Sequence, residues 1–159
     1  LTFTYKHFDG AMPVPGELDA SSNSLLKKAE DTLTRVDELI YGCHFREALR
    51  AAMALAQEAN RYLEEKSPWK AIARGKEAVA TPLYTAITVI SCLRTVLYPF
   101  LPFSSQKLHR LLGFTGDAAA LGWRLVPPVP GQKLVKPEPL FTKLEEHIVE
   151  QEAERLGVR

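Results

Sequence analysis

The sequence predicts an all-α protein: a bundle of about five main helices, followed by an extended arm and a final helix. Three observations predict this class. Apolar residues recur at the three- to four-residue spacing of helices, alternation typical of strands is almost absent, and most of the 11 prolines lie in two loop stretches. At 159 residues, with 46% hydrophobic and 25% charged residues, the composition is that of one ordinary compact domain.

The first two helices are separated by a loop. Residues 1–8 read as the end of a helix, which Asp9 and Gly10 stop. Residues 12–16 form a loop, because their prolines fix φ and remove donors. The second helix is expected from about residue 21 to 41, with Gly42 as its C-terminal stop. Its apolar face consists of Leu25, Leu26, Ala29, Leu33, Val36 and Ile40.

A third helix is predicted from about residue 45 to 66, where many alanines permit close helix packing. Asn60 is a polar amide on its apolar stripe. Ser67 and Pro68 then begin a short helix, since serine can cap free amides and proline suits the first helical position. Gly75 ends that helix. The expected apolar face of the third helix consists of Phe45, Leu49, Ala52, Met53, Ala56, Asn60 and Leu63.

The next helix, expected from about residue 78 to 98, is apolar nearly all round. A helix of that kind is buried on every side, so it should be the centre of the bundle. Pro82 must then lie in the first turn. In an alternative start, Thr81 is the cap and Pro82 the first helical residue.

The C-terminal part begins where the prolines of residues 99–102 break the chain. Ser104 or Ser105 caps a short helix that ends at Gly113. Residues 114–139 are rich in proline and glycine, which predicts an extended segment.

A last helix follows from about residue 141 to 156, with Leu144, Ile148 and Leu156 as its apolar positions. Its acidic residues are most simply a solvated face.

Bulk properties narrow the function without deciding it. A formal charge of +1 neither requires nor excludes a nucleic-acid partner, so any RNA contact must come from a local patch. Cys43 and Cys92 form no CxxC pair, and no metal site is expected. We favour two free thiols, although a disulfide is an alternative. The sequence contains no run of about 18 apolar residues, so no membrane span is expected. We expect a cytoplasmic protein, with an organelle as the alternative.

One segment combines an aromatic ring with positive charge. Trp69 follows the predicted helix start at residues 67–68, where free backbone amides favour anions. Lys70 and Arg74 lie nearby. An indole beside cations is suited to stacking on an unpaired base. The alternative is that Trp69 is a core residue and that the cations form a solvated rim.

Four ordered motifs resemble the methionyl-tRNA synthetase family. The segment NRYLEEKSPWKAIA at residues 60–73 is similar to the family's Asn-x-Tyr and Pro-Trp signature. YPFLPFSSQKL at residues 98–108 and KPEPLFTKLE at residues 136–145 are similar to two later family segments. Phe-Asp-Gly at residues 8–10 matches the end of the family's first bundle helix. Each motif alone is weak, and the ordered set is specific.

The resemblance implies the fold of the anticodon-binding domain of class I aminoacyl-tRNA synthetases. It implies that Trp69 stacks on an anticodon base and that Asn60 belongs to the signature, as an RNA contact or as a buried amide between helices. The family's asparagine and arginine of the first bundle helix align with Thr2 and Lys6. Lys6 keeps the charge and loses the bidentate fork. The implied RNA-binding residues are Trp69, Lys6, Thr2, Asn60, Lys70 and Arg74.

The resemblance also implies a parent ligase that attaches methionine to tRNA with ATP and Mg. The family's catalytic motifs do not occur in this sequence, so no catalytic residue and no cofactor is expected in it. Its partners would be the CAU anticodon loop of methionine tRNA and the catalytic domain of the same enzyme. We expect an anticodon-binding bundle at residues 1–113. We also expect an arm and helix at residues 114–159 that pack back on the bundle and the catalytic domain, all within one domain.

Two other functions remain open at this point. The chain could be the homologous domain of another class I synthetase, for leucine, isoleucine, valine or cysteine. It could also be a helical protein-interaction module without a role in RNA binding. That second alternative predicts a buried Trp69.

Overall fold

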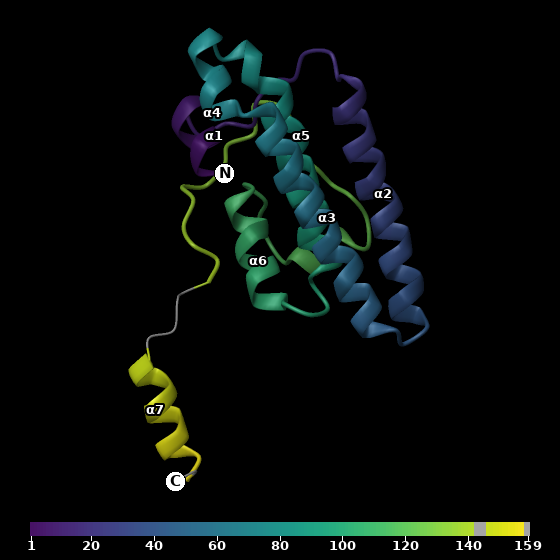
Figure 1. The fold of residues 1–159 in the computed structure, drawn as a ribbon, viewed down its shortest axis with the longest axis vertical. Coiled ribbons are helices and arrows are strands. Elements are labelled where there is room, and N and C mark those ends of the chain that lie inside the picture. The colour runs from purple at the N-terminus through teal and green to yellow at the C-terminus, as the bar shows by residue number, and fades with distance from the viewer. Residues whose placement is uncertain (142–145, 158–159) are drawn as a thin grey trace.

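The computed structural model describes residues 1–141 and 146–157, and it is all-α as predicted (Figure 1). Within the described residues there is no strand, and the only β feature is an isolated bridge between Ala11 and Lys133. The helices are α1 (Thr2–His7), α2 (Ala20–Tyr41), α3 (Phe45–Lys66), α4 (Pro68–Ala71), η1 (Ile72–Arg74), α5 (Glu77–Val96), α6 (Pro102–Leu111), η2 (Ala118–Leu121) and α7 (Glu146–Arg155).

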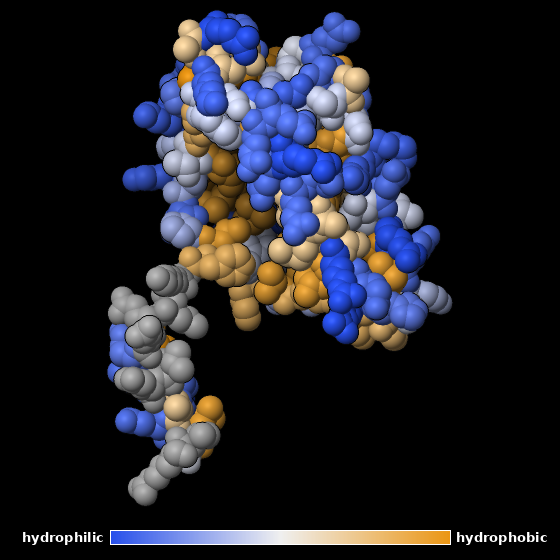
Figure 2. Space-filling model, viewed as in Figure 1, coloured by the Kyte–Doolittle hydropathy of each residue, from blue (hydrophilic) through white to orange (hydrophobic). Residues whose placement is uncertain are grey.

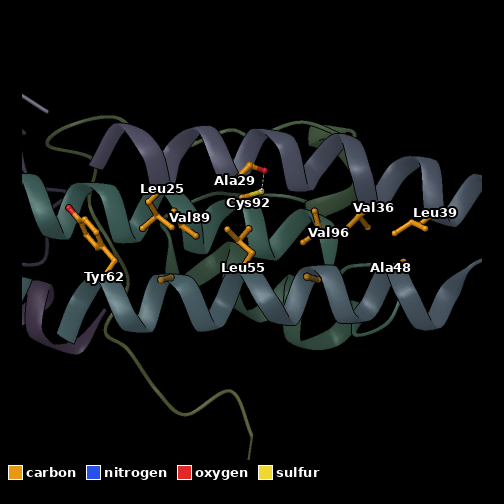
Figure 3. Packing of buried hydrophobic residues seen from close by; sticks show 12 residues of the cluster. Leu25, Ala29, Val36, Leu39, Ala48, Leu55, Tyr62, Val89, Cys92 and Val96 are labelled. Atoms are coloured by element: carbon orange, nitrogen blue, oxygen red, sulfur yellow. Dashed lines mark hydrogen bonds between the residues drawn. The ribbon is translucent and has the colours of Figure 1, made fainter. Parts of the chain in front are cut away.

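Three long helices, α2, α3 and α5, form the main core (Figure 3). As predicted, α5 is the central helix, and most of its residues are buried. It is long and apolar enough to cross a membrane by composition alone, but 72% of the apolar window is buried inside the protein. Its apolarity is therefore that of a core helix. The core residues shown in Figure 3 include Leu25, Ala29, Val36, Leu39, Ala48, Leu55, Tyr62, Val89, Cys92 and Val96.

The buried face of α3 differs from the predicted apolar face, because most of the buried residues come one position earlier in the sequence than predicted. The buried residues are Ala48, Ala52, Leu55, Ala59 and Tyr62. By contrast, Phe45, Leu49 and Met53 are exposed, as is Asn60. Three alanines line the buried seam together with Leu55 and Tyr62, and small side chains let α2 and α5 approach α3 closely.

Two helix starts also differ from the prediction. α5 begins at Glu77, so Pro82 lies inside the helix beyond the first turn, and Thr81 is not the cap. Its hydroxyl instead accepts a hydrogen bond from the backbone N–H of Gly16 at 2.9 Å. α6 begins at Pro102, which leaves Ser104 and Ser105 inside the helix rather than at its cap.

The turn between α2 and α3 assigns different roles to two neighbouring residues. Gly42 caps α2 as predicted, but its φ is −80°, and Cys43 adopts the left-handed φ of 60°. The amide of His44 donates to the carbonyl of Leu39, and the amide of Cys43 donates to that of Ile40. This pair of bonds is the Schellman motif, which satisfies the last carbonyls of the helix.

The segment from residue 114 to 141 is mostly extended, as predicted, but it contains the short helix η2. It runs back along the bundle and adds Leu134 to a second apolar cluster that includes Met12, Ile87 and Leu112. At Gly113 a Cβ would lie 2.0 Å from the carbonyl oxygen of Lys133. Only glycine therefore permits this close approach, and its φ of 82° favours glycine as well.

The last helix, α7, is described over Glu146–Arg155, within the predicted span of residues 141–156. Residues 142–145, with the predicted apolar Leu144 and part of the closing motif, lie outside the described residues. Ile148 is half-buried and Leu156 is exposed. Figure 1 shows α7 apart from the bundle, and the space-filling view from the same side shows the same arrangement (Figure 2).

Both cysteines are free thiols, as favoured, and the alternative of a disulfide is wrong. Cys43 is exposed, whereas Cys92 is buried and its thiol donates to the carbonyl of Ala29 at 3.3 Å. Burial raises the pKa of Cys92 to about 12, so this thiol stays protonated at neutral pH.

Candidate nucleic-acid interface

Trp69 stands on a short helix whose start is fixed by a sharp turn. α3 ends at Lys66, Ser67 adopts a left-handed φ of 43°, and Pro68 is buried at the first position of α4. The sequence predicted that the side chain of Ser67 caps α4, and this prediction is wrong. The hydroxyl of Ser67 instead donates to the carbonyl of Glu64 at 2.6 Å. The turn leaves the indole of Trp69 51% exposed. The alternative that Trp69 is a core residue is therefore wrong.

The positive charge beside Trp69 comes from side chains. A cleft next to this helix is lined by Lys66, Lys70 and Arg74, together with Glu65. In the described part of the chain, neither Lys70 nor Arg74 forms an ion pair, and both are exposed. α4 has only four residues, so its N-terminus adds little to the local field. The ring and two uncommitted cations thus share one end of the bundle.

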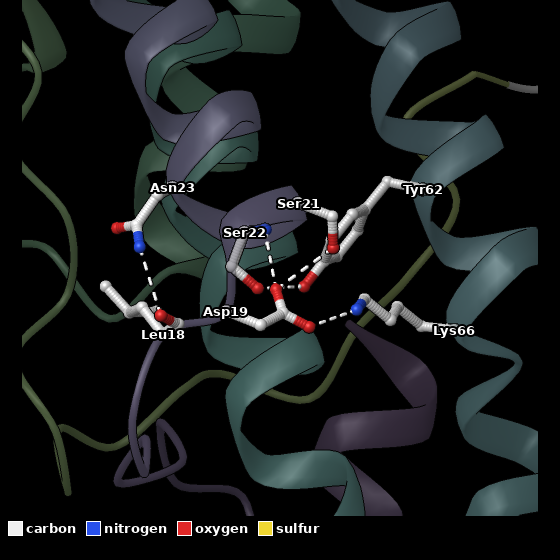
Figure 4. A network of polar contacts seen from close by, with 7 residues as sticks. All are labelled: Leu18, Asp19, Ser21, Ser22, Asn23, Tyr62 and Lys66. Carbon is white, nitrogen blue, oxygen red and sulfur yellow. Dashed lines mark hydrogen bonds and ion pairs between the residues drawn. The ribbon is translucent and has the colours of Figure 1, made fainter.

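A polar network holds the turn that precedes Trp69 (Figure 4). Asp19 accepts a hydrogen bond from the amide of Ser22 at 2.8 Å, which caps α2, and its carboxylate also pairs with Lys66 at the end of α3. Ser22 and Tyr62 share a hydrogen bond between their hydroxyl groups at 2.8 Å. Lys66, and then the Ser22 contacts, hold the pKa of Asp19 well below its ordinary range. The start of α2 is thereby fastened to the end of α3.

The sequence reasoning missed this network, although one signal was present. Asp19 precedes three small residues and a helical pattern, and aspartate is a strong N-cap. The partner of its second oxygen, Lys66, is 47 residues away and could not be inferred from local pattern.

Thr2 and Lys6 lie on α1, four residues apart, and both are exposed. α1 packs through Phe3 and Phe8 on an apolar cluster that contains Ala71 of α4, together with Val79 and Leu83 of α5. Because of this shared cluster, α1 and α4 lie at the same end of the bundle (Figure 1). Thr2 and Lys6 are thus placed at the end that carries Trp69.

Asn60 is exposed on α3, two turns before the end of that helix. The alternative that it is a buried amide between helices is therefore wrong. No described group of three or more His, Cys, Asp or Glu residues could hold a metal ion.

The comparison with protein families gives one match over most of the chain. Residues 12–159 match the family described as the anticodon binding domain of methionyl tRNA ligase. The match includes Asn60, Trp69, Lys70 and Arg74, whereas α1 with Thr2 and Lys6 lies before it.

Similar curated proteins are methionine–tRNA ligases. One from Dehalococcoides mccartyi is 52% identical over 134 residues, which cover 84% of this chain and 24% of that protein. One from Roseiflexus castenholzii is 39% identical and covers the whole chain and 31% of that protein. The chain thus spans about a quarter to a third of the length of these relatives.

Among solved structures, the free methionyl-tRNA synthetase of Mycobacterium tuberculosis is similar to this chain with a TM-score of 0.80 and 28% identity. The similarity covers 91% of this chain and 30% of that one. Fold, sequence and ordered motifs agree, and the chain belongs to the family of anticodon binding domains of methionyl tRNA ligases.

Proposed function

We propose that this domain holds the CAU anticodon loop of methionine tRNA on a surface centred on Trp69. The observation that carries the proposal is a half-exposed indole on a short segment that also presents two exposed cations, Lys70 and Arg74, without carboxylate partners in the described part of the chain. The ring offers a face to one unpaired base, and the cations attract the phosphates on either side of it. With a formal charge of only +1, the domain has no general basic excess, so the proposal combines stacking on Trp69 with the local charges of Lys70 and Arg74.

Thr2, Lys6 and Asn60 extend this surface in the proposal. All three are exposed, and the first two share the end of the bundle with Trp69. A hydroxyl, an ammonium and an amide supply donors to base edges or phosphates. Replacing Thr2 with Val, Lys6 with Gln and Asn60 with Ala, one at a time, tests each contact by the affinity for the same stem-loop.

The activity of the whole protein is part of the same proposal. The parent ligase joins methionine to tRNA with ATP and Mg in a catalytic domain outside this chain, and it does so in the cytoplasm. Residues 1–113 read the anticodon. Residues 114–159 form the arm and helix that meet the catalytic domain in the parent enzyme; the arm packs on the bundle through Leu134, whereas α7 lies apart from it. One related structure, from M. tuberculosis, contains methionyl-adenylate.

The first experiment uses fluorescence anisotropy to measure how tightly an anticodon stem-loop binds to the domain. The stem-loop carries either CAU or a scrambled triplet. Loss of stacking costs about 1–3 kcal/mol, so Trp69→Ala should weaken binding of the CAU stem-loop roughly 5- to 150-fold. The matched control is Tyr41→Ala, because Tyr41 is an aromatic residue that is 94% exposed at the far end of α2. Equal losses in both variants, or no preference for CAU in the unmodified protein, would contradict the proposal.

The second experiment places the same change in the parent ligase. Trp69→Ala should raise KM for tRNA and leave methionine-dependent ATP–pyrophosphate exchange near normal, because the ring contacts tRNA and not the reacting atoms. A proportional loss of both activities would show instead that the change damages the enzyme as a whole.

A further inference from the structure

Arg94 is the largest fully buried side chain in the described structure. It lies on α5, where it is only 2% exposed. One terminal nitrogen donates to Nδ1 of His109 at 3.3 Å, and the other donates to the hydroxyl of Thr95 at 3.2 Å. The guanidinium carbon also lies 5.1 Å from the centre of the Phe114 ring. These partners use two of the five N–H donors of a guanidinium.

No partner of Arg94 carries negative charge. Since Arg94 can only donate, Nδ1 of His109 accepts, and its Nε2–H donates to the carbonyl of Thr115 at 3.1 Å. The imidazole is therefore neutral, and burial lowers the pKa of His109. Burial also lowers the pKa of Arg94, although a guanidinium stays charged in proteins. Within the described residues, no carboxylate forms an ion pair with Arg94. A buried charge without a counter-charge is costly, so this cation calls for an anion.

A cleft of about 190 Å³ opens beside this cation. Arg94 and Thr95 are its most deeply buried lining residues, and Trp123, Tyr98 and Ala119 form part of its walls. Trp123 is held in place, because its indole N–H donates to the carbonyl of Leu33 at 3.1 Å. A dry cavity of about 150 Å³ is large enough for benzene, so the cleft has room for one small ring.

We propose that this cleft binds a small carboxylic acid with an apolar body, whose carboxylate pairs with Arg94. The aromatic and alanine walls suit the apolar body, and the guanidinium has free donors for the carboxylate oxygens. RNA phosphate is a poor fit, because a ribose-phosphate chain is polar along its whole length. The site is independent of the Trp69 surface, because Arg94 lies near the C-terminal end of α5, whereas α4 with Trp69 packs near the N-terminal end, at Val79 and Leu83.

The test uses benzoate as the probe and the indole N–H resonance of Trp123 as the reporter. The chain contains two tryptophans, so Trp69→Phe assigns the two resonances. Titration at constant ionic strength should shift the Trp123 resonance saturably with benzoate. Benzyl alcohol, which has the same ring and no charge, should bind about tenfold more weakly or worse, because hydrogen bonds to charged groups are the stronger ones. Sulfate should not compete at equal concentration.

Two variants separate the site from general damage. Arg94→Met removes the charge and keeps the length, and it should abolish the preference for benzoate over benzyl alcohol. Ala119→Leu leaves Arg94 in place and fills the cleft from an exposed position on η2, so it should block both probes even if Arg94→Met fails to fold. The proposal is overturned if benzoate gives no saturable shift, if benzyl alcohol binds as well, if sulfate displaces benzoate, or if Ala119→Leu leaves binding unchanged.

Discussion

The two tryptophans of the chain lie on or beside short helices, yet their surroundings are opposite. Trp123 follows η2, packs on the main core and donates its indole N–H to the carbonyl of Leu33. Trp69 lies in α4, is 51% exposed, and has no hydrogen bond from its indole in the described part of the chain. Lys66, Lys70 and Arg74 line a cleft next to α4, the helix that carries Trp69, whereas the cation that shares a cleft with Trp123 is the buried Arg94.

The partners of an indole, rather than its secondary structure, decide its role in these two places. An aromatic ring has a large apolar body and one polar N–H. At Trp123 both are used within the fold, so the side chain ties the arm to α2. At Trp69 both are left open, and that arrangement favours binding over stability.

The largest expected difference is in stability. Trp123→Ala should lower the free energy of unfolding by about 3 kcal/mol, since it removes a packed ring and a hydrogen bond. Trp69→Ala should change that free energy by no more than about 0.5 kcal/mol, as is usual for surface positions. Urea unfolding followed by circular dichroism measures both. Equal destabilisation by the two changes would show that both rings contribute to stability in the same way.

The polar network near Trp69 should contribute less than the packing of Trp123. Asp19→Ala removes the cap of α2 and should cost about 1 kcal/mol in urea unfolding. Asp19→Asn is the control, because asparagine caps nearly as well but cannot pair with Lys66 as an anion. Since the folded pKa of Asp19 is lowered, its contribution is present above the ordinary pKa of aspartate and is lost as the pH falls through the lowered value. A full loss in Asp19→Asn would show that the ion pair matters more than the cap.

Lys70 and Arg74 should each contribute to the salt dependence of the affinity for RNA. If Lys70 and Arg74 each contact one phosphate, then Lys70→Gln and Arg74→Gln should each reduce the slope of log K against log salt by about 0.7. Arg50→Gln is the matched control, because Arg50 is exposed on α3 and has no ion pair among the described residues. An unchanged slope in the first two variants would remove these side chains from the interface.

The smallest effect concerns pH and the region near Trp123. His109 is buried and neutral, and its folded pKa is lowered by burial. The unfolded chain therefore binds more protons, and the stability should fall as the pH drops below about 6.5. His109→Gln, which keeps an acceptor and a donor, should flatten that part of the profile. A profile that rises toward acidic pH in the unmodified protein would contradict a neutral His109.

Local sequence pattern predicted most of the helices. It did not predict features that depend on packing between residues far apart in the sequence. The spans of α2 and α3 and the position of Trp69 follow from apolar spacing and from Ser67-Pro68. The buried seam of α3 does not, because its alanines carry a weaker apolar signal than Phe45 or Met53. The sequence predicts that the helix of Arg94 is central, but only the fold shows that His109 of α6 and Phe114 of the arm lie against its guanidinium.

The pairing of Asp19 with Lys66 was equally hidden, because two long helices separate the two residues in sequence. The assignments of Thr2, Lys6, Asn60, Lys70 and Arg74 to RNA remain predictions. Their exposure is established, and their contacts with RNA require the complex.

The most direct measurement of the central claim is the fluorescence of Trp69 during RNA binding. In a Trp123→Phe protein, Trp69 is the sole tryptophan. Stacking of a base on its exposed ring should quench the emission saturably on addition of the CAU stem-loop, with a midpoint that matches the affinity measured by anisotropy. Binding of the stem-loop with no change in Trp69 emission would contradict the account.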